Sequence, residues 1–304
     1  MTKIAILTST FADESTEAGR LLSSRGYQIV RNPHGRKTTV AETLEIASSA
    51  EGVIAGLESY DRTVLGKLSS LRVISRVGVG TDAIDLEEID RRRIRLFTTP
   101  EAVVQPVAEL TVGLILSLAR HLTFHDAALK AGRWERKQGM LLEGRRVGLV
   151  GYGRIGRRVG EILTAFGCRV SAFDPVAASG GKAERAGSLN QLLAESDIVS
   201  LHASAKPGAA PLIGADQLSH MKPTAYLVNT SRGSLVDEKA LYEALKAKRL
   251  AGAALDVFTD EPYKGPLQTL ENVLLTAHIG SMAKESRQAM EMEAVQNLLK
   301  GLST

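Results

Sequence analysis

Three glycines, Gly151, Gly153 and Gly156, follow an apolar run and precede a helical pattern that begins at Arg157. This spacing lets the chain turn tightly, lets the backbone approach a pyrophosphate closely, and lets the next helix sit near the strand. The positive end of that helix then faces the phosphates and favours an anion without any particular side chain. The segment therefore predicts a Rossmann unit that binds a dinucleotide; a glycine-rich turn without a ligand is the alternative.

An acidic residue, Asp174, ends the strand that follows this helix. In a dinucleotide-binding unit, a carboxylate at this place binds the ribose 2′-hydroxyl and repels the additional phosphate of NADP. Asp174 therefore indicates NAD as the cofactor. The alternative is a turn residue that ends the strand before Pro175.

Short apolar runs alternate with amphipathic helical patterns along nearly the whole chain, which is typical of an α/β protein with parallel sheets. Two series of strands are expected. The first comprises 3–7, 28–30, 52–55, 73–75 and 94–97, with helices such as 15–24 and 40–49 between them. The second comprises 146–150, 169–173, 198–201, 225–229, 253–257 and 273–275.

The two series predict two doubly wound parallel-sheet domains. A flavodoxin-like substrate domain is expected over 1–99 plus 283–304, because the helical tail has no strand after it and is expected to pack back on the first series. A Rossmann NAD-binding domain is expected over 100–282. A long apolar helix from Val107 to Arg120 is expected to lie between the domains and to cover part of both.

Composition and charge exclude several classes of protein. With 304 residues, 44% of them hydrophobic, the chain predicts a packed globular protein, and no run approaches the ~20 apolar residues that span a bilayer. The start becomes polar too early for a signal peptide, and Cys168 is the only cysteine, so a cytoplasmic location without disulfides is expected. The net charge of +4 comes from basic residues interspersed with acidic ones. We therefore expect no nucleic-acid or membrane partner, and no metal site.

Further motifs surround the glycine turn in a fixed order. They occupy residues 77–85 (VGVGTDAID), 107–111 (VAELT), 132–134 (GRW), 221–223 (MKP), 229–233 (NTSRG), 254–258 (ALDVF) with 261–262 (EP), and 276–280 (TAHIG). With these motifs the chain resembles the D-isomer-specific 2-hydroxyacid dehydrogenase family over almost its whole length. That family includes phosphoglycerate, glycerate/hydroxypyruvate, lactate and formate dehydrogenases. The resemblance implies an NAD-dependent oxidoreductase that moves a hydride between nicotinamide and C2 of a small D-2-hydroxy acid or 2-oxo acid.

The resemblance assigns three catalytic roles. Arg232 would hold the substrate carboxylate and polarise the carbonyl, a task that suits a planar guanidinium. His278 would give a proton to the carbonyl oxygen as hydride arrives, and Glu261 would pair with His278 and favour its charged form. Taken singly, Arg232 and Glu261 also fit exposed loop residues. All three candidates follow predicted strands, however, and therefore lie at the edge where doubly wound sheets bind ligands.

The resemblance also implies binding residues. On the cofactor side they are Gly151, Gly153, Arg154, Ile155, Gly156, Asp174, His202, Thr230, Ser231 and Asp256, with Asp256 expected at the nicotinamide carboxamide. On the substrate side they are Arg76, Val79, Gly80 and Arg232, with the backbone amides of Val79 and Gly80 expected at the carboxylate. A homodimer is implied as well.

The sequence leaves two alternatives for the substrate, one with a phosphate on its tail and one without. Glu58 stands where phosphoglycerate-specific chains often carry an arginine and would repel a phosphate, whereas Arg76 matches a basic position of that type. The candidate substrates are 3-phosphoglycerate and hydroxypyruvate or glyoxylate. The alternative functions are an NAD(H)-sensing corepressor-like interaction protein and a phosphonate- or phosphite-type dehydrogenase.

Overall fold

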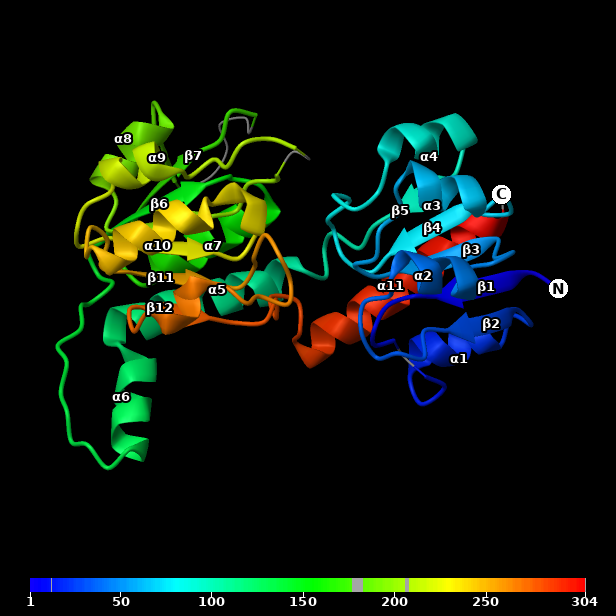
Figure 1. The fold of residues 1–304 in the computed structure, drawn as a ribbon, viewed down its shortest axis with the longest axis horizontal. Coiled ribbons are helices and arrows are strands. Elements are labelled where there is room, and N and C mark those ends of the chain that lie inside the picture. The colour runs from blue at the N-terminus through cyan, green and yellow to red at the C-terminus, as the bar shows by residue number, and fades with distance from the viewer. Residues whose placement is uncertain (12, 177–182, 206–207, 304) are drawn as a thin grey trace. The chain divides into compact units, whose positions relative to one another are not determined.

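The computed structural model describes residues 1–11, 13–176, 183–205 and 208–303. The chain divides into two compact units, each of which is described by itself (Figure 1). Unit 1 comprises Met1–Val103 and Ser281–Thr304, and unit 2 comprises Val104–Gly280. Unit 1 is therefore assembled from both ends of the chain, and unit 2 is continuous.

Unit 1 is built on a five-stranded parallel sheet in the order β2-β1-β3-β4-β5. Its strands are β1 (Lys3–Ile6), β2 (Gln28–Arg31), β3 (Gly52–Ala55), β4 (Val73–Arg76) and β5 (Arg95–Phe97). All pairs are parallel, so the loops that follow β1, β3 and β4 leave the sheet at the same edge. In doubly wound sheets this is the edge that receives ligands.

Helices cover both faces of this sheet. The helices α1 (Glu17–Ser23) and α11 (Lys284–Ser303) pack on one face, and α2 (Val40–Ile46), α3 (Arg62–Lys67) and α4 (Leu86–Arg92) pack on the other (Figure 1). Successive residues of β4 show the alternation, because Ser75 donates to the carbonyl oxygen of Ala294 in α11 at 2.8 Å, whereas Ile74 joins the core that contains Ile46 and Leu65. The expected return of the C-terminal helix to the first series of strands is confirmed.

Unit 2 is built on a seven-stranded parallel sheet in the order β12-β11-β10-β9-β6-β7-β8. Its strands are β6 (Arg146–Val150), β7 (Arg169–Phe173), β8 (Glu184–Arg185), β9 (Ile198–Leu201), β10 (Tyr226–Asn229), β11 (Gly252–Leu255) and β12 (Val273–Leu275). The direction of winding reverses between β6 and β9, which creates the switch point where such sheets bind dinucleotides.

Two helical layers enclose this second sheet. The helices α5 (Val104–Arg120) and α7 (Arg154–Ala165) pack together on one face, and α8 (Leu189–Glu195), α9 (Ala215–His220) and α10 (Glu238–Lys246) pack on the other. The short elements η1 (Gly233–Leu235) and η2 (Pro266–Thr269) follow β10 and β11, and α6 (Leu122–Lys130) continues from α5. The buried side chains form one core cluster on each face.

The fold class predicted from the sequence, two doubly wound parallel-sheet units, is confirmed. Helices α5 and α7 begin three residues before the predicted starts, and the two-residue strand β8 was not predicted. Among the described residues no single helix is long and apolar enough to span a membrane. The pair α5 and α6 meets that criterion only when joined across a bend of 64°.

Candidate active site

The catalytic candidates of unit 2 lie on three neighbouring loops. Arg232 follows β10, Glu261 follows β11 and His278 follows β12, and these strands are adjacent and parallel. Their carboxyl ends therefore meet at one edge of the sheet. The sequence predicted that these three residues lie on loops at strand ends, and the structure places them there.

His278 and Glu261 form a direct contact. The imidazole Nδ1 lies 2.8 Å from Glu261 Oε2, and about a third of each side chain is exposed (35% and 32%). The other carboxylate oxygen, Oε1, accepts the Phe258 backbone N–H at 3.1 Å, which fixes the orientation of the carboxylate. Because an ionised carboxylate only accepts hydrogen bonds, Nδ1 is the donor and Nε2 is the atom left to exchange a proton.

The loop that carries His278 is anchored by Asp256, which is 1% exposed. Its Oδ1 accepts the Thr276 hydroxyl at 2.6 Å and the Ile279 N–H at 2.8 Å, and its Oδ2 accepts the Gly280 N–H at 2.9 Å. The Asp256 carbonyl also accepts the His278 N–H at 2.8 Å, while His278 takes a left-handed backbone conformation with φ of 53°. One buried carboxylate thus binds the loop on both sides of the imidazole.

The loop that carries Arg232 is organised by a buried amide, Asn229. Its Oδ1 accepts the Ser231 N–H at 3.1 Å and its Nδ2 donates to the Arg232 carbonyl at 2.9 Å. The next residue, Gly233, lies so close to the Phe258 backbone that a Cβ there would stand 1.9 Å from the Phe258 carbonyl carbon. The β10 and β11 loops are therefore packed backbone to backbone, which sequence inspection did not predict for Asn229 or Gly233.

Thr230 connects the Arg232 loop to helix α5 of unit 2. Its hydroxyl lies 2.8 Å from the Thr111 hydroxyl of α5, and both residues are buried. The Arg232 side chain is partly buried, and its Nη1 donates to the Ser231 carbonyl at 2.7 Å. The guanidinium is thus oriented by its own loop.

The glycine turn between β6 and α7 has no room for a side chain at Gly151 or Gly156, whereas Gly153 faces open space. Gly151 has φ of 94°, and a Cβ there would lie 2.5 Å from the backbone of His202 and Ala203. A Cβ at Gly156 would lie 2.3 Å from the Gly151 carbonyl oxygen. Gly153 is the N-cap of helix α7, and it has no side chain that could accept a hydrogen bond from the first turn of the helix. This arrangement suits a phosphate group.

Asp174 connects the end of β7 to the same turn. Its Oδ2 accepts the Tyr152 N–H at 2.8 Å and its Oδ1 accepts the Val176 N–H at 2.8 Å. The carboxylate is therefore held beside the glycine turn, where a ribose hydroxyl of a bound dinucleotide is expected. The residues present fit a dinucleotide, with a cradle at the glycines and a hydrogen-bond acceptor next to it.

His202 follows β9 and lies against the glycine turn. Its Nε2 is 2.9 Å from the buried Ser200 hydroxyl, and its Nδ1 is buried with no hydrogen-bond partner among the described residues. Burial lowers the pKa of His202 to about 4, so the imidazole is neutral at neutral pH. A Cβ at Gly156 would lie 3.5 Å from His202 Cβ, which places this side chain directly beside the turn.

The substrate candidates of unit 1 share one loop. Residues Val77–Gly80 follow β4, and Arg76 at the end of that strand donates from Nε to the Gly80 carbonyl at 3.0 Å and from Nη1 to the Val77 carbonyl at 3.1 Å. Gly78 exchanges hydrogen bonds with Thr99, through its N–H to the hydroxyl at 2.8 Å and its carbonyl from the Thr99 N–H at 3.0 Å. The loop is therefore fixed on two sides.

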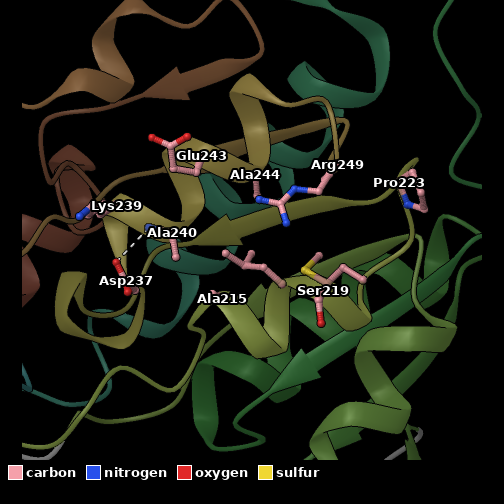
Figure 2. A pocket seen from close by; sticks show the side chains of 11 residues that line it. Ala215, Ser219, Pro223, Asp237, Lys239, Ala240, Glu243, Ala244 and Arg249 are labelled. Carbon is pink, nitrogen blue, oxygen red and sulfur yellow. Dashed lines mark hydrogen bonds between the residues drawn. The ribbon is translucent and has the colours of Figure 1, made fainter.

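A hollow of about 470 Å³ lies elsewhere on unit 2, between α9 and α10 (Figure 2). Ser219, Lys239, Glu243 and Arg249 are among the residues that line it. None of the catalytic or cofactor candidates lines this hollow, so it is separate from the strand-end loops described above.

Known proteins of one family resemble this chain in sequence. The family model for the D-isomer specific 2-hydroxyacid dehydrogenase, NAD binding domain, matches residues 112–280. The chain is 36% identical to the hydroxypyruvate reductase of Thermotoga maritima over 94% of this chain and 95% of that protein. It is 40% identical to the D-3-phosphoglycerate dehydrogenase of Methanocaldococcus jannaschii over 86% of this chain, and the match spans about half of that protein (52%).

A solved structure agrees with these matches. The TT0316 protein of Thermus thermophilus superposes with a TM-score of 0.91 and 35% identity over 99% of this chain and 97% of that protein. The resemblance deduced from the motifs is confirmed by the family model and by relatives that align along nearly the whole chain. The chain therefore belongs to the D-isomer specific 2-hydroxyacid dehydrogenase family and is an NAD-dependent enzyme of that family.

Proposed function

We propose that Arg232, Glu261 and His278 carry out the reduction of a small 2-oxo acid and the reverse oxidation of a D-2-hydroxy acid. The observation that carries this proposal is the 2.8 Å contact between His278 Nδ1 and Glu261 Oε2 on a strand-end loop. Bound NADH supplies the hydride that reaches C2, and in the reverse direction NAD accepts it. His278 Nε2 gives the proton that the carbonyl oxygen takes up, and removes it again in the oxidation.

The other two residues prepare this proton transfer. The Glu261 carboxylate holds the imidazole in one orientation and stabilises the imidazolium that exists before the proton leaves. Arg232 binds the substrate carboxylate and polarises the carbonyl, because its planar fork matches two oxygen acceptors at once. In unit 1 we assign Val79 and Gly80 to the substrate carboxylate through their backbone amides, and Arg76 to the same loop.

We assign the dinucleotide to the glycine turn and its neighbours. Gly151, Gly153 and Gly156 give the backbone its close approach, the amides of Arg154 and Ile155 face the phosphates, and Asp174 accepts the ribose hydroxyls. Further cofactor neighbours are His202, Thr230, Ser231 and Asp256. The hydrogen bonds of Asp256 to its loop add a second task, which is to position His278.

Asp174→Asn is expected to lower the preference for NAD over NADP by about tenfold or more, because the amide cannot repel the additional phosphate. The substitution keeps one oxygen that can accept the Tyr152 N–H, so the turn itself is preserved. Steady-state kcat/KM with each cofactor measures the ratio. Asp216→Asn on the exposed surface of α9 is the control and should leave the ratio unchanged. A wild-type preference for NADP would contradict the role of Asp174.

The substrate is proposed to be a small D-2-hydroxy acid or its 2-oxo acid, with hydroxypyruvate, glyoxylate and the 3-phosphoglycerate pair as candidates. The named relatives support this range, since one is a hydroxypyruvate reductase and the other a D-3-phosphoglycerate dehydrogenase. Glyoxylate, hydroxypyruvate, pyruvate, phosphohydroxypyruvate and 2-oxoglutarate should be compared by the loss of NADH absorbance. Lack of turnover with all five would refute the proposed function. Neither relative favours the corepressor-like or the phosphite-type alternative.

We further propose that the protein is a cytoplasmic homodimer with no nucleic-acid or membrane partner. Helix α6 and the segment after it extend away from the sheet of unit 2 (Figure 1). They expose the apolar side chains Leu122, Leu129, Trp134 and Leu141, which are 52–78% exposed. Exposed apolar side chains along one projecting segment suit an interaction surface, and a second copy of the same chain is the commonest partner.

The double variant Leu129→Ser, Trp134→Ser is expected to be a monomer, because it removes two of the most exposed apolar side chains of this surface. Sedimentation equilibrium should give about twice the chain mass of 32.6 kDa for the wild type and the single mass for the variant. Leu86→Ser in α4, which is also half exposed, is the matched control and should stay dimeric. A monomeric wild type would contradict the proposal.

A further inference from the structure

The loop that carries Glu261 is held by two carboxylates. The backbone amides of Phe258 and Thr259, which follow one another just after β11, each donate to a glutamate. The Phe258 N–H donates to Glu261 Oε1 at 3.1 Å, so this bond lies within the loop. The Thr259 N–H donates to Glu238 Oε1 at 2.7 Å, and Glu238 lies 21 positions earlier in the chain. The second carboxylate therefore supports the loop from outside it.

Glu238 is placed beside this loop by helix α10, of which it is the first residue. Helix α10 connects the parallel neighbours β10 and β11, so it begins at the edge of the sheet where the loops after both strands lie. Asp237 is the N-cap, and its Oδ1 accepts the Ala240 N–H at 3.0 Å (Figure 2). A different acidic residue therefore caps the helix, and the half-buried Glu238 side chain supports the neighbouring loop.

The peptide group between Phe258 and Thr259 is also confined by packing. A Cβ at Gly233 would lie 1.9 Å from the Phe258 carbonyl carbon and 2.3 Å from the Thr259 nitrogen, so the two backbones are in direct contact. The Phe258 ring stacks on Tyr263, with 4.3 Å between the ring centroids. These contacts fix where the peptide group lies, and the hydrogen bond to Glu238 fixes the direction of its N–H.

The backbone at Phe258 decides where the Glu261 carboxylate lies. One oxygen of this carboxylate accepts the Phe258 N–H, and the other lies 2.8 Å from His278 Nδ1. The two peptide groups that carry the donors meet at the Phe258 Cα, so a loop without the bond to Glu238 gains freedom at both. About a third of the His278 and Glu261 side chains is exposed (35% and 32%). Water therefore competes for their contact when the carboxylate turns away.

We propose that Glu238 is a positioning residue for proton transfer: its hydrogen bond to the Thr259 N–H holds the loop in which Glu261 contacts His278. The inference rests on the proposed function, in which His278 moves the proton and Glu261 orients the imidazole. In this role Glu238 exchanges no proton itself and acts through Glu261. A small displacement of a catalytic group from its productive geometry costs a large share of the rate, so a support from outside the loop matters.

Two conservative substitutions separate the hydrogen bond from the charge. Glu238→Gln removes the charge and keeps a carbonyl oxygen at the same reach, so it should retain the rate within about twofold. Glu238→Asp keeps the charge, and with it the favourable interaction with the start of the helix, but is one methylene too short to reach the Thr259 N–H. It should lower the single-turnover rate of NADH oxidation by a 2-oxo acid by about tenfold. Glu238→Ala, which has no side-chain acceptor, should show the same loss.

Further measurements distinguish positioning from a general loss of structure. KM for the 2-oxo acid and the dissociation constant for NADH should stay within about twofold of wild type in all three variants, because Arg232 and the glycine turn bind those ligands. Thermal unfolding, followed by circular dichroism, identifies any variant that does not fold, and either Glu238→Asp or Glu238→Ala suffices for the test. Glu243→Asp, at an exposed position of the same helix, is the matched control and should leave the rate unchanged.

A double-mutant cycle with Glu261→Ala tests the route of the effect. Without the Glu261 carboxylate the loop has no group to orient toward His278, so adding Glu238→Asp should change the remaining rate by less than about twofold. A further tenfold loss in that background would show that Glu238 acts by another route, and would overturn the inference.

The outcomes separate the inference from the proposed function. A folded Glu238→Asp or Glu238→Ala protein with the wild-type rate would overturn the inference alone, and so would a Glu238→Gln protein that is as slow as Glu238→Asp. If Glu261→Ala kept the wild-type rate, or if no 2-oxo acid were turned over, the proposed function would fail and the inference with it.

Discussion

His278→Asn is expected to lower kcat for the 2-oxo acid by about 10²–10⁴-fold, the usual contribution of a positioned acid or base. Asparagine can still donate a hydrogen bond toward Glu261, but it has no ring nitrogen that can give and take a proton. The left-handed backbone at this position, with φ of 53°, is tolerated by asparagine better than by most residues, so the loop should keep its shape. Steady-state kinetics gives the loss in kcat.

Binding of NADH provides the internal check on this variant. The glycine turn and Asp174 belong to other loops, so the dissociation constant for NADH, measured by fluorescence titration, should stay within about threefold of wild type. His220→Asn, at a half-buried position in the last turn of α9, is the matched control and should be fully active. Near-normal turnover by His278→Asn would show that another group moves the proton.

Much of the fold was predictable because its determinants are local. The spacing of Gly151, Gly153 and Gly156 after an apolar run predicted the sequence of β6, turn and α7, and the structure has that sequence. Glycine is required there by a positive φ at Gly151 and by contacts below 3 Å at Gly151 and Gly156, which are properties of a short stretch of chain. Apolar strands of four or five residues were located for the same reason.

Contacts between distant segments were not predictable in the same way. Asp256 was expected at the nicotinamide, but its hydrogen bonds to Thr276, Ile279 and Gly280 join residues some twenty positions apart. Such bonds depend on the pairing of β11 with β12, which a linear pattern does not specify. The loop hydrogen bonds of Asn229 follow the same rule, because the side chain of a strand-end residue can point into a loop or into solvent.

The burial of Glu58 is a second feature that the linear pattern does not show. Charged side chains are almost never fully buried without partners, and nothing in the residues around Glu58 indicates that it has them. In the structure, the Gly56 amide and the Tyr60 hydroxyl supply two partners from the same short loop, and the side chain folds inward. Only the three-dimensional packing of β1, β3 and β4 decides this outcome.

The loops that carry the reactive side chains of unit 2 are supported in the same way. Each reactive side chain sits on a loop whose backbone is held by a buried polar residue, Asp256 for His278 and Asn229 for Arg232. A catalytic group must be held close to its productive geometry, and rigid support from hydrogen-bonded neighbours achieves this. The support residues are therefore as informative about the reaction as the reactive groups themselves.

Arg232→Lys is expected to lower kcat/KM for the 2-oxo acid by about 10²-fold or more, because lysine offers a point charge in place of a planar fork. The loop should persist, since Asn229 Nδ2 donates to the backbone carbonyl of residue 232 and not to its side chain. A rise in KM alone would indicate a role in carboxylate binding, whereas an equal loss in kcat and kcat/KM would indicate polarisation of the carbonyl in the transition state.

The matched control for this substitution is Arg249→Lys, an exposed arginine beside the hollow between α9 and α10. It should leave both kinetic constants unchanged, and NADH binding should be unaffected in either variant. Loss of NADH binding in Arg232→Lys would assign the arginine to the cofactor instead of the substrate. Full activity of that variant would contradict its proposed role, because a guanidinium that orients a carboxylate and polarises a carbonyl through two parallel hydrogen bonds has no equivalent in a single ammonium.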